Sequence, residues 1–348
     1  MVSGDAARNS YPLYNTTFTL HRLSPIYNGL DAPLDNTTLV PYARRFRDIL
    51  VGDVLRGVRV GLGSDEDVLA HVGALQTVTW KILVLEDTWD SSATDEAQAD
   101  ETIEFAPGRG IYVNITYERA NYVAILLRSK KAYPDGEGRG FERFPLLLTR
   151  MPGSLRETFT EFLESSFDAR VSPLRIGRPY LPSIFESYVR SCLLGEDGEE
   201  TSLEESSGTL KKILKDVQVV VGFDLPSGDA ALKTVDIIVA RDDLPRFLQR
   251  GSKIPKKPTA KDSPKMPFME ALTLYVHTHL ALNLGHEDVN ILRVACGAFV
   301  LGAEGKAKLT EPIEFDGDNA QGRATAILID DLIQFAEGAV MSKAGDAR

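Results

Sequence analysis

The chain has 348 residues, of which 43% are hydrophobic and 26% charged, and its formal net charge is −11. These values are typical of a globular protein with more than one hydrophobic core. No apolar run approaches the roughly 18 residues that span a bilayer, and the N-terminal segment lacks the apolar core of a signal peptide, so we expect neither a membrane protein nor a secreted one. The two cysteines, Cys192 and Cys296, fit a reducing compartment such as the cytosol or nucleus.

The acidic residues are concentrated in two segments. Residues 86–104 carry eight acids and residues 196–205 carry six, and neither segment carries a base. Without these fourteen charges the formal charge of −11 becomes +3. Because acidic runs of this kind are typically solvated, the rest of the chain is mildly basic, and the low isoelectric point does not exclude a nucleic-acid partner.

The N-terminal half is predicted to contain both strands and helices. Alternation of polar and apolar residues predicts strands, and apolar residues three and four apart predict helices. The predicted strands are residues 14–23, 72–85, 110–117, 122–128 and 144–149. One predicted helix begins at Pro41 and the other at Pro152, because proline is favoured in a first helical turn.

The C-terminal half has the same mixed character. The predicted helices are residues 179–194, 244–249, 268–282 and 324–340. The predicted strands are residues 217–223, 235–240, 289–301 and 307–315. Strands and helices do not alternate as they do in a parallel sheet, so the predicted fold class is α+β.

Two domains are predicted, residues 11–177 and residues 178–342. Each would be an α+β domain with its own core. Residues 86–104, 195–208 and 250–266 are predicted to be flexible charged loops.

No group of residues predicts an active site. His277 and His279 are two residues apart on a predicted helix and so point in different directions, whereas zinc sites on helices use a spacing of three or four. No cysteine or carboxylate completes a metal set with them and His286. The sequence also lacks a phosphate-binding P-loop and a nucleophile elbow, so we expect no enzyme activity, no cofactor and no metal.

Basic side chains cluster in two places. Residues 41–63 contain five arginines against two aspartates, and the cluster comprises Arg44, Arg45, Arg47, Arg56 and Arg59. The segment 250–265 contains Lys256 and Lys257. Either cluster could contact DNA phosphates or an acidic partner. The alternatives are pairing of the arginines with Asp48, Asp53 or the chain's own acidic segments, and a merely solubilising role for the lysines.

The segment 289–315 is the candidate protein interface. Its strand 289–301 is longer and more apolar than a strand with one buried face requires. It is either a buried core strand or an edge strand that pairs with another chain. The candidate partner-binding residues are Val289, Ile291, Val294, Ala298, Val300, Leu309 and Ile313.

Several stretches resemble the fungal branch of the CENP-L family of inner-kinetochore proteins. They are LYNTTFTLHRLSPIY at 13–27, ARRFRDILVGDVLRGVRVGL at 43–62, ALQTVTWKIL at 74–83, and the stretch from FPLLLTR to SPLRI at 144–176. The resemblance covers most of the N-terminal half and is looser from the second acidic segment onward.

The resemblance implies a non-enzymatic scaffold subunit in the nucleus, at the centromere. Such proteins pair with CENP-N, help the pair attach to the CENP-A nucleosome and its DNA, and connect to CENP-C. The implied fold has curved, mainly antiparallel sheets with helices packed on one face. The implied partner contact is in the C-terminal half, and a homodimer is implied when the partner is absent.

Two other functions remain open from the residues alone. One is an independent DNA-binding protein that uses its basic face, which a groove lined with basic charge would favour. The other is an unrecognised enzyme, which a pocket with converging titratable groups would favour.

Overall fold

The structure is a computed structural model, and it describes part of the chain. The described residues are 11–29, 33–56, 72–86, 89, 109–129, 140–195, 198–199, 201–224, 233–255, 265–314 and 319–338. Contacts divide the chain into a first unit, residues 1–174 with 333–338, and a second unit, residues 175–332 with 339–348. The domain boundary predicted from the sequence followed residue 177.

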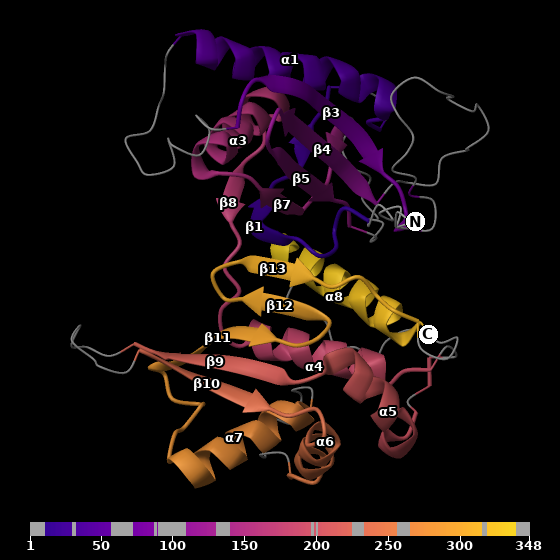
Figure 1. Ribbon diagram of the computed structural model, residues 1–348, viewed down its shortest axis with the longest axis vertical. Coiled ribbons are helices and arrows are strands. Elements are labelled where there is room, and N and C mark those ends of the chain that lie inside the picture. The colour runs from indigo at the N-terminus through magenta and orange to yellow at the C-terminus, as the bar shows by residue number, and fades with distance from the viewer. Residues whose placement is uncertain are drawn as a thin grey trace, which may run out of the picture. The chain divides into compact units, whose positions relative to one another are not determined.

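The described part of the first unit is an antiparallel sheet with two helices (Figure 1). Its strands lie in the order β1-β7-β5-β4-β3, with the short β8 pairing on the other side of β1, and a separate ribbon joins β2 to β6. The strands are β1 (Thr17–Leu23), β2 (Ile26–Tyr27), β3 (Leu75–Leu83), β4 (Gly110–Tyr117), β5 (Asn121–Leu127), β6 (Phe141–Glu142), β7 (Leu146–Arg150) and β8 (Val171–Pro173). The helices are α1 (Asn36–Arg56) and α3 (Gly153–Phe167).

Helix α1 begins before the predicted start at Pro41, which lies inside the helix. Its true start follows Asp35, whose Oδ1 accepts hydrogen bonds from the backbone N–H groups of Thr37 at 2.9 Å and Thr38 at 2.7 Å. A side-chain acceptor of this kind satisfies the first N–H groups of a helix, which have no partner within it. The prediction was wrong because it took the proline rather than the aspartate as the start signal.

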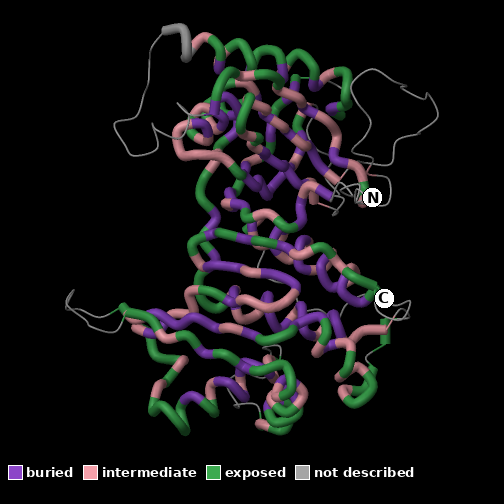
Figure 2. The backbone as a smooth tube through the Cα atoms, viewed as in Figure 1, coloured by how far each residue is buried: buried purple, intermediate pink, exposed green. Residues whose placement is uncertain are grey.

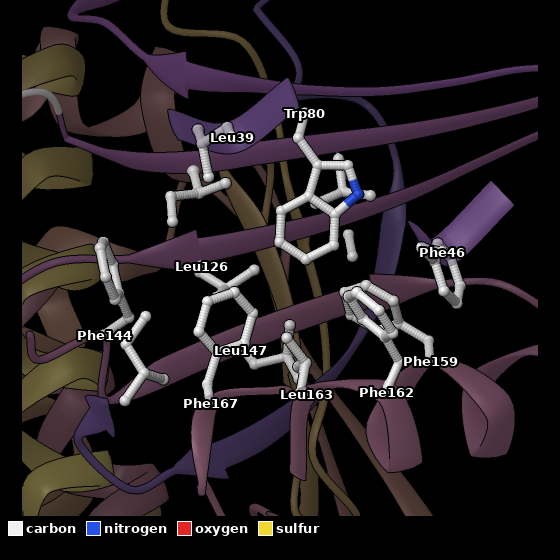
Figure 3. Close-up of a cluster of buried hydrophobic side chains, with 14 of the residues drawn as sticks. Leu39, Phe46, Trp80, Leu126, Phe144, Leu147, Phe159, Phe162, Leu163 and Phe167 are labelled. Carbon is white, nitrogen blue, oxygen red and sulfur yellow. The ribbon is translucent and has the colours of Figure 1, made fainter. Parts of the chain in front are cut away.

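The core of the first unit lies between its sheet and both helices (Figure 3). The apolar faces predicted for the two helices point into it, and Phe46 of α1 stacks on Phe159 and Phe162 of α3 with ring centroids 5.4 and 4.9 Å apart. Trp80 of β3 packs against the same two rings of α3. These contacts hold α1 and α3 on one face of the sheet.

The second unit is also an antiparallel sheet with helices, in the strand order β10-β9-β11-β12-β13. Its strands are β9 (Val217–Phe223), β10 (Thr234–Val239), β11 (Val289–Ala295), β12 (Phe299–Gly302) and β13 (Lys306–Leu309). Its helices are α4 (Tyr180–Cys192), α5 (Leu203–Leu214), α6 (Leu244–Ser252), α7 (Pro267–Leu280) and α8 (Ala320–Glu337), whose last residues fall in the first unit. The α+β class predicted from the sequence is confirmed.

Helix α5 corrects the prediction of a flexible loop over residues 195–208. It begins at Leu203, and the Oγ of Ser202 accepts a hydrogen bond from the backbone N–H of Glu205 at 3.3 Å. Its buried residues are Leu210, Ile213 and Leu214, spaced as one face of a helix. The acidic composition of its first turn concealed this apolar face, although acids near a helix N-terminus are favourable. The predicted loop 86–104 lies almost entirely outside the described residues, as do residues 256–264 of the predicted loop 250–266, whose first residues instead belong to α6, which ends at Ser252.

The core of the second unit is built on α4. Phe185 stacks on Phe268 of α7 with centroids 5.0 Å apart, and Tyr188 stacks on Phe299 of β12 at the same distance. A carboxylate is buried among these apolar groups: Oε1 of Glu186 accepts a hydrogen bond from the backbone N–H of Met269 at 2.7 Å. Glu186 therefore caps the first turn of α7 from a neighbouring helix.

Candidate functional site

Strand β11, which contains the first part of the predicted partner-binding segment, is an interior strand. It pairs with β9 on one side, from Val289 to Ala295, and with β12 on the other side. Over Arg293–Ala295 it therefore has a neighbouring strand on both sides. Of the two interpretations of residues 289–301, the structure shows an interior strand whose high apolar content reflects burial in the sheet. A contact of this segment with a partner stays a prediction. A proline at Val294 would break the fold of the second unit rather than a contact with a partner.

The side chains of the candidate partner-binding residues divide into two groups. Those of Val289, Val294, Ala298 and Leu309 are buried in the chain's own core. Ile291 and Val300 are half-buried, and Ile313 is exposed over 57% of its surface. Of the seven, Ile313 is the one whose side chain is free to contact another protein extensively.

Strand β10 is an edge of the second unit's sheet. It pairs with β9 over six residues, from Thr234 opposite Gly222 to Val239 opposite Val217. No strand among the described residues pairs with its other side. Figure 1 shows β10 at the border of the sheet. Sequence reasoning predicted the strand but gave it no role.

The hydrogen-bond pattern fixes which residues of β10 face outward. The backbone N–H of Phe223 donates to the carbonyl of Lys233, the residue just before β10, so Phe223 and Lys233 form a hydrogen-bonded pair. Because bonded and non-bonded pairs alternate in an antiparallel ladder, Val235, Ile237 and Val239 bond to β9. Thr234, Asp236 and Ile238 then direct their N–H and C=O groups away from the sheet.

The side chains on this edge are also informative. Thr234, Asp236 and Ile238 are exposed, while Ile237 and Val239 are buried. Ile238 is exposed over 67% of its surface, the highest value among the large hydrophobic residues that the structure describes. The alternation TVDIIV with an isoleucine on the exposed face was the signal in the sequence that could have identified this edge.

Helix α7 adds exposed apolar side chains in the same unit, namely Leu274, Tyr275 and Leu280. Tyr275 stacks on Phe247 of α6, with centroids 5.7 Å apart, and on His279, with centroids 4.4 Å apart. At 100° per residue these three side chains point in different directions around α7, so they are separate exposed residues and do not form one apolar face.

The predicted basic residues of α1 point to solvent. Arg44, Arg45 and Arg47 are exposed, and no ion pair joins them to an acid among the described residues. Figure 2 shows exposed positions along α1. These three arginines therefore form no ion pair with Asp48. Arg56 is the last residue of α1, and its side chain lies outside the described set, as do Arg59, Lys256 and Lys257 altogether.

Burial shifts the pKa values of both cysteines and of one carboxyl group in the second unit. Burial raises the pKa of the Cys296 thiol to about 11 and raises that of Cys192 further. A nucleophilic cysteine needs the opposite shift, because the thiolate is the reactive form. Burial also raises the pKa of Glu186 to about 7, and this carboxyl group is engaged with the first turn of α7.

The histidines do not converge either. His277 and His279 lie exposed near the end of α7, and His286 Nδ1 lies 3.4 Å from Asp288 Oδ2. Within the part of the chain that the structure describes, no three His, Cys, Asp or Glu side chains are grouped so that they could hold a metal ion. None of the described helices is both long and apolar enough to cross a bilayer.

Within the described residues, the sheet edge at β10 and the exposed arginines of α1 are features that allow a protein to assemble with others. The sequence profile of the CENP-L family, Centromere protein L, matches residues 12–337. Since the match spans nearly the whole chain, this chain belongs to the CENP-L family of centromere proteins and has a role at the centromere and kinetochore. No curated protein sequence matches the chain.

Proposed function

We propose that this chain is a non-enzymatic scaffold subunit of the inner kinetochore, in the nucleus, which pairs with CENP-N through strand β10. The pair would support attachment to the CENP-A nucleosome and to CENP-C during chromosome segregation. The membership in the CENP-L family supports the kinetochore role. The exposed edge of β10 is the observation that carries the proposed contact.

A partner strand could extend this sheet without disturbing it. The outward N–H and C=O groups of Thr234, Asp236 and Ile238 would form the new ladder, and Ile238 would lose its exposed surface to the partner. Strand addition of this kind supplies backbone hydrogen bonds for affinity, while the exposed side chains supply specificity. In the absence of CENP-N, the β10 strands of two copies could pair around a twofold axis and form the homodimer.

The test replaces Ile238 with proline and, separately, with serine. Proline removes an N–H that faces away from β9, so the internal ladder is kept while one bond to the partner is lost. Serine keeps the N–H and removes only the apolar side chain. We expect co-expressed CENP-N to co-elute with the wild type in size exclusion, to be lost from Ile238→Pro, and to be weakened with Ile238→Ser.

The control is Leu85→Ser, which removes an exposed apolar side chain in the first unit. Circular dichroism and thermal melting of each variant separate lost pairing from unfolding. If Ile238→Pro melts like the wild type and still binds CENP-N at full strength, the contact lies elsewhere, and Ile313 is the next residue to test.

A further inference from the structure

Helix α1 carries two lines of side chains with the same spacing. The buried line consists of Leu39, Ala43, Phe46 and Leu50, which pack into the core of the first unit. The second line follows one residue later, about 100° around the helix, and consists of Val40, Arg44, Arg47 and Val51. All four residues of this second line, which we call the outer seam, are exposed.

The outer seam has the spacing of a helix-packing surface. Its steps of four, three and four residues are those of the a and d positions of a coiled coil, where one helix meets another. Val40 and Val51 at its two ends are exposed over 43% and 41% of their surface. Valine is a weaker helix former than alanine or leucine, so helix propensity does not explain why these two exposed positions carry valine.

The arginines of the outer seam differ from their neighbour Arg45. The guanidinium carbon of Arg45 lies 6.0 Å from the ring centroid of Phe162, so this side chain leans over α3 within its own unit. For Arg44 and Arg47, no ion pair or ring contact is recorded among the described residues. Their positive charges are thus available between two exposed apolar side chains.

We propose that the outer seam binds an acidic amphipathic helix of a partner protein. Carboxylates of that helix would pair with Arg44 and Arg47, and its apolar side chains would cover Val40 and Val51. Arginine suits this role because its planar guanidinium binds carboxylates with two parallel hydrogen bonds.

A DNA backbone fits the outer seam less well. Phosphates would satisfy Arg44 and Arg47 but would leave both valines in water, since direct contacts to the backbone are polar. The proposal concerns the first unit and does not depend on strand pairing by β10 in the second, so either can fail without the other.

The test uses synthetic probes and the full chain. The first probe is a panel of helical peptides with leucine at a and d positions and glutamate permuted over the flanking positions. The second is the same panel with serine in place of leucine, and the third is duplex DNA. Fluorescence anisotropy measures the affinity of each for the wild type and for two double variants, Val40→Ser with Val51→Ser and Arg44→Gln with Arg47→Gln.

The matched controls are Arg45→Gln with Arg246→Gln, which removes the same charge off the seam, and Ile313→Ser, which removes an apolar side chain in the second unit. We expect at least one leucine peptide to bind the wild type about tenfold more tightly than its serine counterpart. The valine variant should lose this preference, the arginine variant should lose binding of both peptides, and the controls should change neither.

Two results would overturn the proposal. One is that no leucine peptide in the panel binds better than its serine counterpart. The other is that duplex DNA binds, is weakened by Arg44→Gln with Arg47→Gln, and is unaffected by the valine substitutions while the peptides do not bind, which would assign the seam to phosphates.

Discussion

The two units end their sheets in different ways. In the first unit, α1 packs along the edge strand β3, and the backbone N–H of Ile82 donates to Oδ1 of Asn36 at 2.7 Å. In the second unit, β9 is the one described strand that pairs with β10, and Ile238 stands exposed beside the outward N–H groups. Natural proteins usually protect an unpaired edge because it invites association. Among the described residues, the β3 edge has a helix against it and the β10 edge has no further strand, which is why we place the proposed partner contact at β10.

The first prediction concerns the aromatic contacts of Phe46, which hold α1 against the edge strand β3. Phe46→Ala should lower the free energy of unfolding by about 3–5 kcal/mol, because the ring is fully buried against two rings of α3 and its loss leaves a cavity. The chain's two tryptophans, Trp80 and Trp89, both lie in the first unit, so fluorescence during urea unfolding reports on it.

The control for Phe46→Ala is Val51→Ala on the exposed side of the same helix, which should change stability by less than about 0.5 kcal/mol. We also expect Phe46→Ala to self-associate through the uncovered β3, measured by light scattering. A loss of stability below about 1 kcal/mol would show that the aromatic contacts do not hold α1 in place.

The second prediction concerns the buried carboxyl group of the second unit. Burial raises the pKa of Glu186 from 4.5 to about 7. Between these values the folded state binds a proton that the unfolded state has released, so stability falls as the pH rises through this range, by up to about 3 kcal/mol. Glu186→Gln keeps an acceptor for the N–H of Met269 and should be more stable than the wild type at pH 8 but not at pH 4.5.

Both cysteines of the chain lie in the second unit, Cys192 buried and Cys296 half-buried, so the reaction of the buried Cys192 thiol with a dithiopyridine reagent during urea unfolding reports on this unit. Glu186→Ala serves as the comparison, because it removes the acceptor together with the charge. A pH dependence that is the same in Glu186→Gln and the wild type would mean that this carboxyl group titrates normally.

The third prediction is the opposite pH dependence of the first unit. Burial, followed by the charge of Arg156, lowers the pKa of His21 from 6.5 to about 4, and its Nε2 lies 3.1 Å from the Oγ1 of Thr149. Between these values the unfolded state binds the proton and the folded state does not, so stability falls as the pH falls from 6.5 to 4, by about 2–3 kcal/mol.

His21→Gln tests this prediction, since its amide can still reach Thr149 but does not titrate. Tryptophan fluorescence should then show a smaller loss of stability on acidification than in the wild type. Equal losses would assign the acid sensitivity of the first unit to other groups.

The same comparison shows what the sequence could predict. The apolar faces of α1 and α3 and the order of elements follow from local periodicity, so most of both units was predictable from the sequence. Which strand lies at an edge depends on pairing between distant segments, so the sequence left open whether residues 289–301 form an interior strand or an edge strand, because both are equally apolar. The exposed arginines of α1 were predicted, whereas the outer seam required the valines to be seen as exposed. The hydrogen bond from the N–H of Ile82 to Asn36 joins residues far apart in the chain, so no local pattern in the sequence predicts it.

The last prediction has the smallest expected effect on stability and concerns the hydrogen bond between Asn36 of α1 and the edge strand β3. Asn36→Ala removes the acceptor for the N–H of Ile82 and should cost about 1 kcal/mol, because one hydrogen bond is lost at a partly exposed site. Hydrogen exchange of the Ile82 amide should quicken, while that of Lys81, which alternates with Ile82 and faces β4, should change only by the global loss of stability. Asn36→Asp should restore the protection, since it retains an acceptor oxygen and places a negative charge in the first turn of α1, where the helix dipole favours it. If the Ile82 amide exchanges at the same rate in Asn36→Ala as in the wild type, the packing of α1 alone covers the edge. The difference between β3 and β10 would then depend on the helix and not on its first side chain.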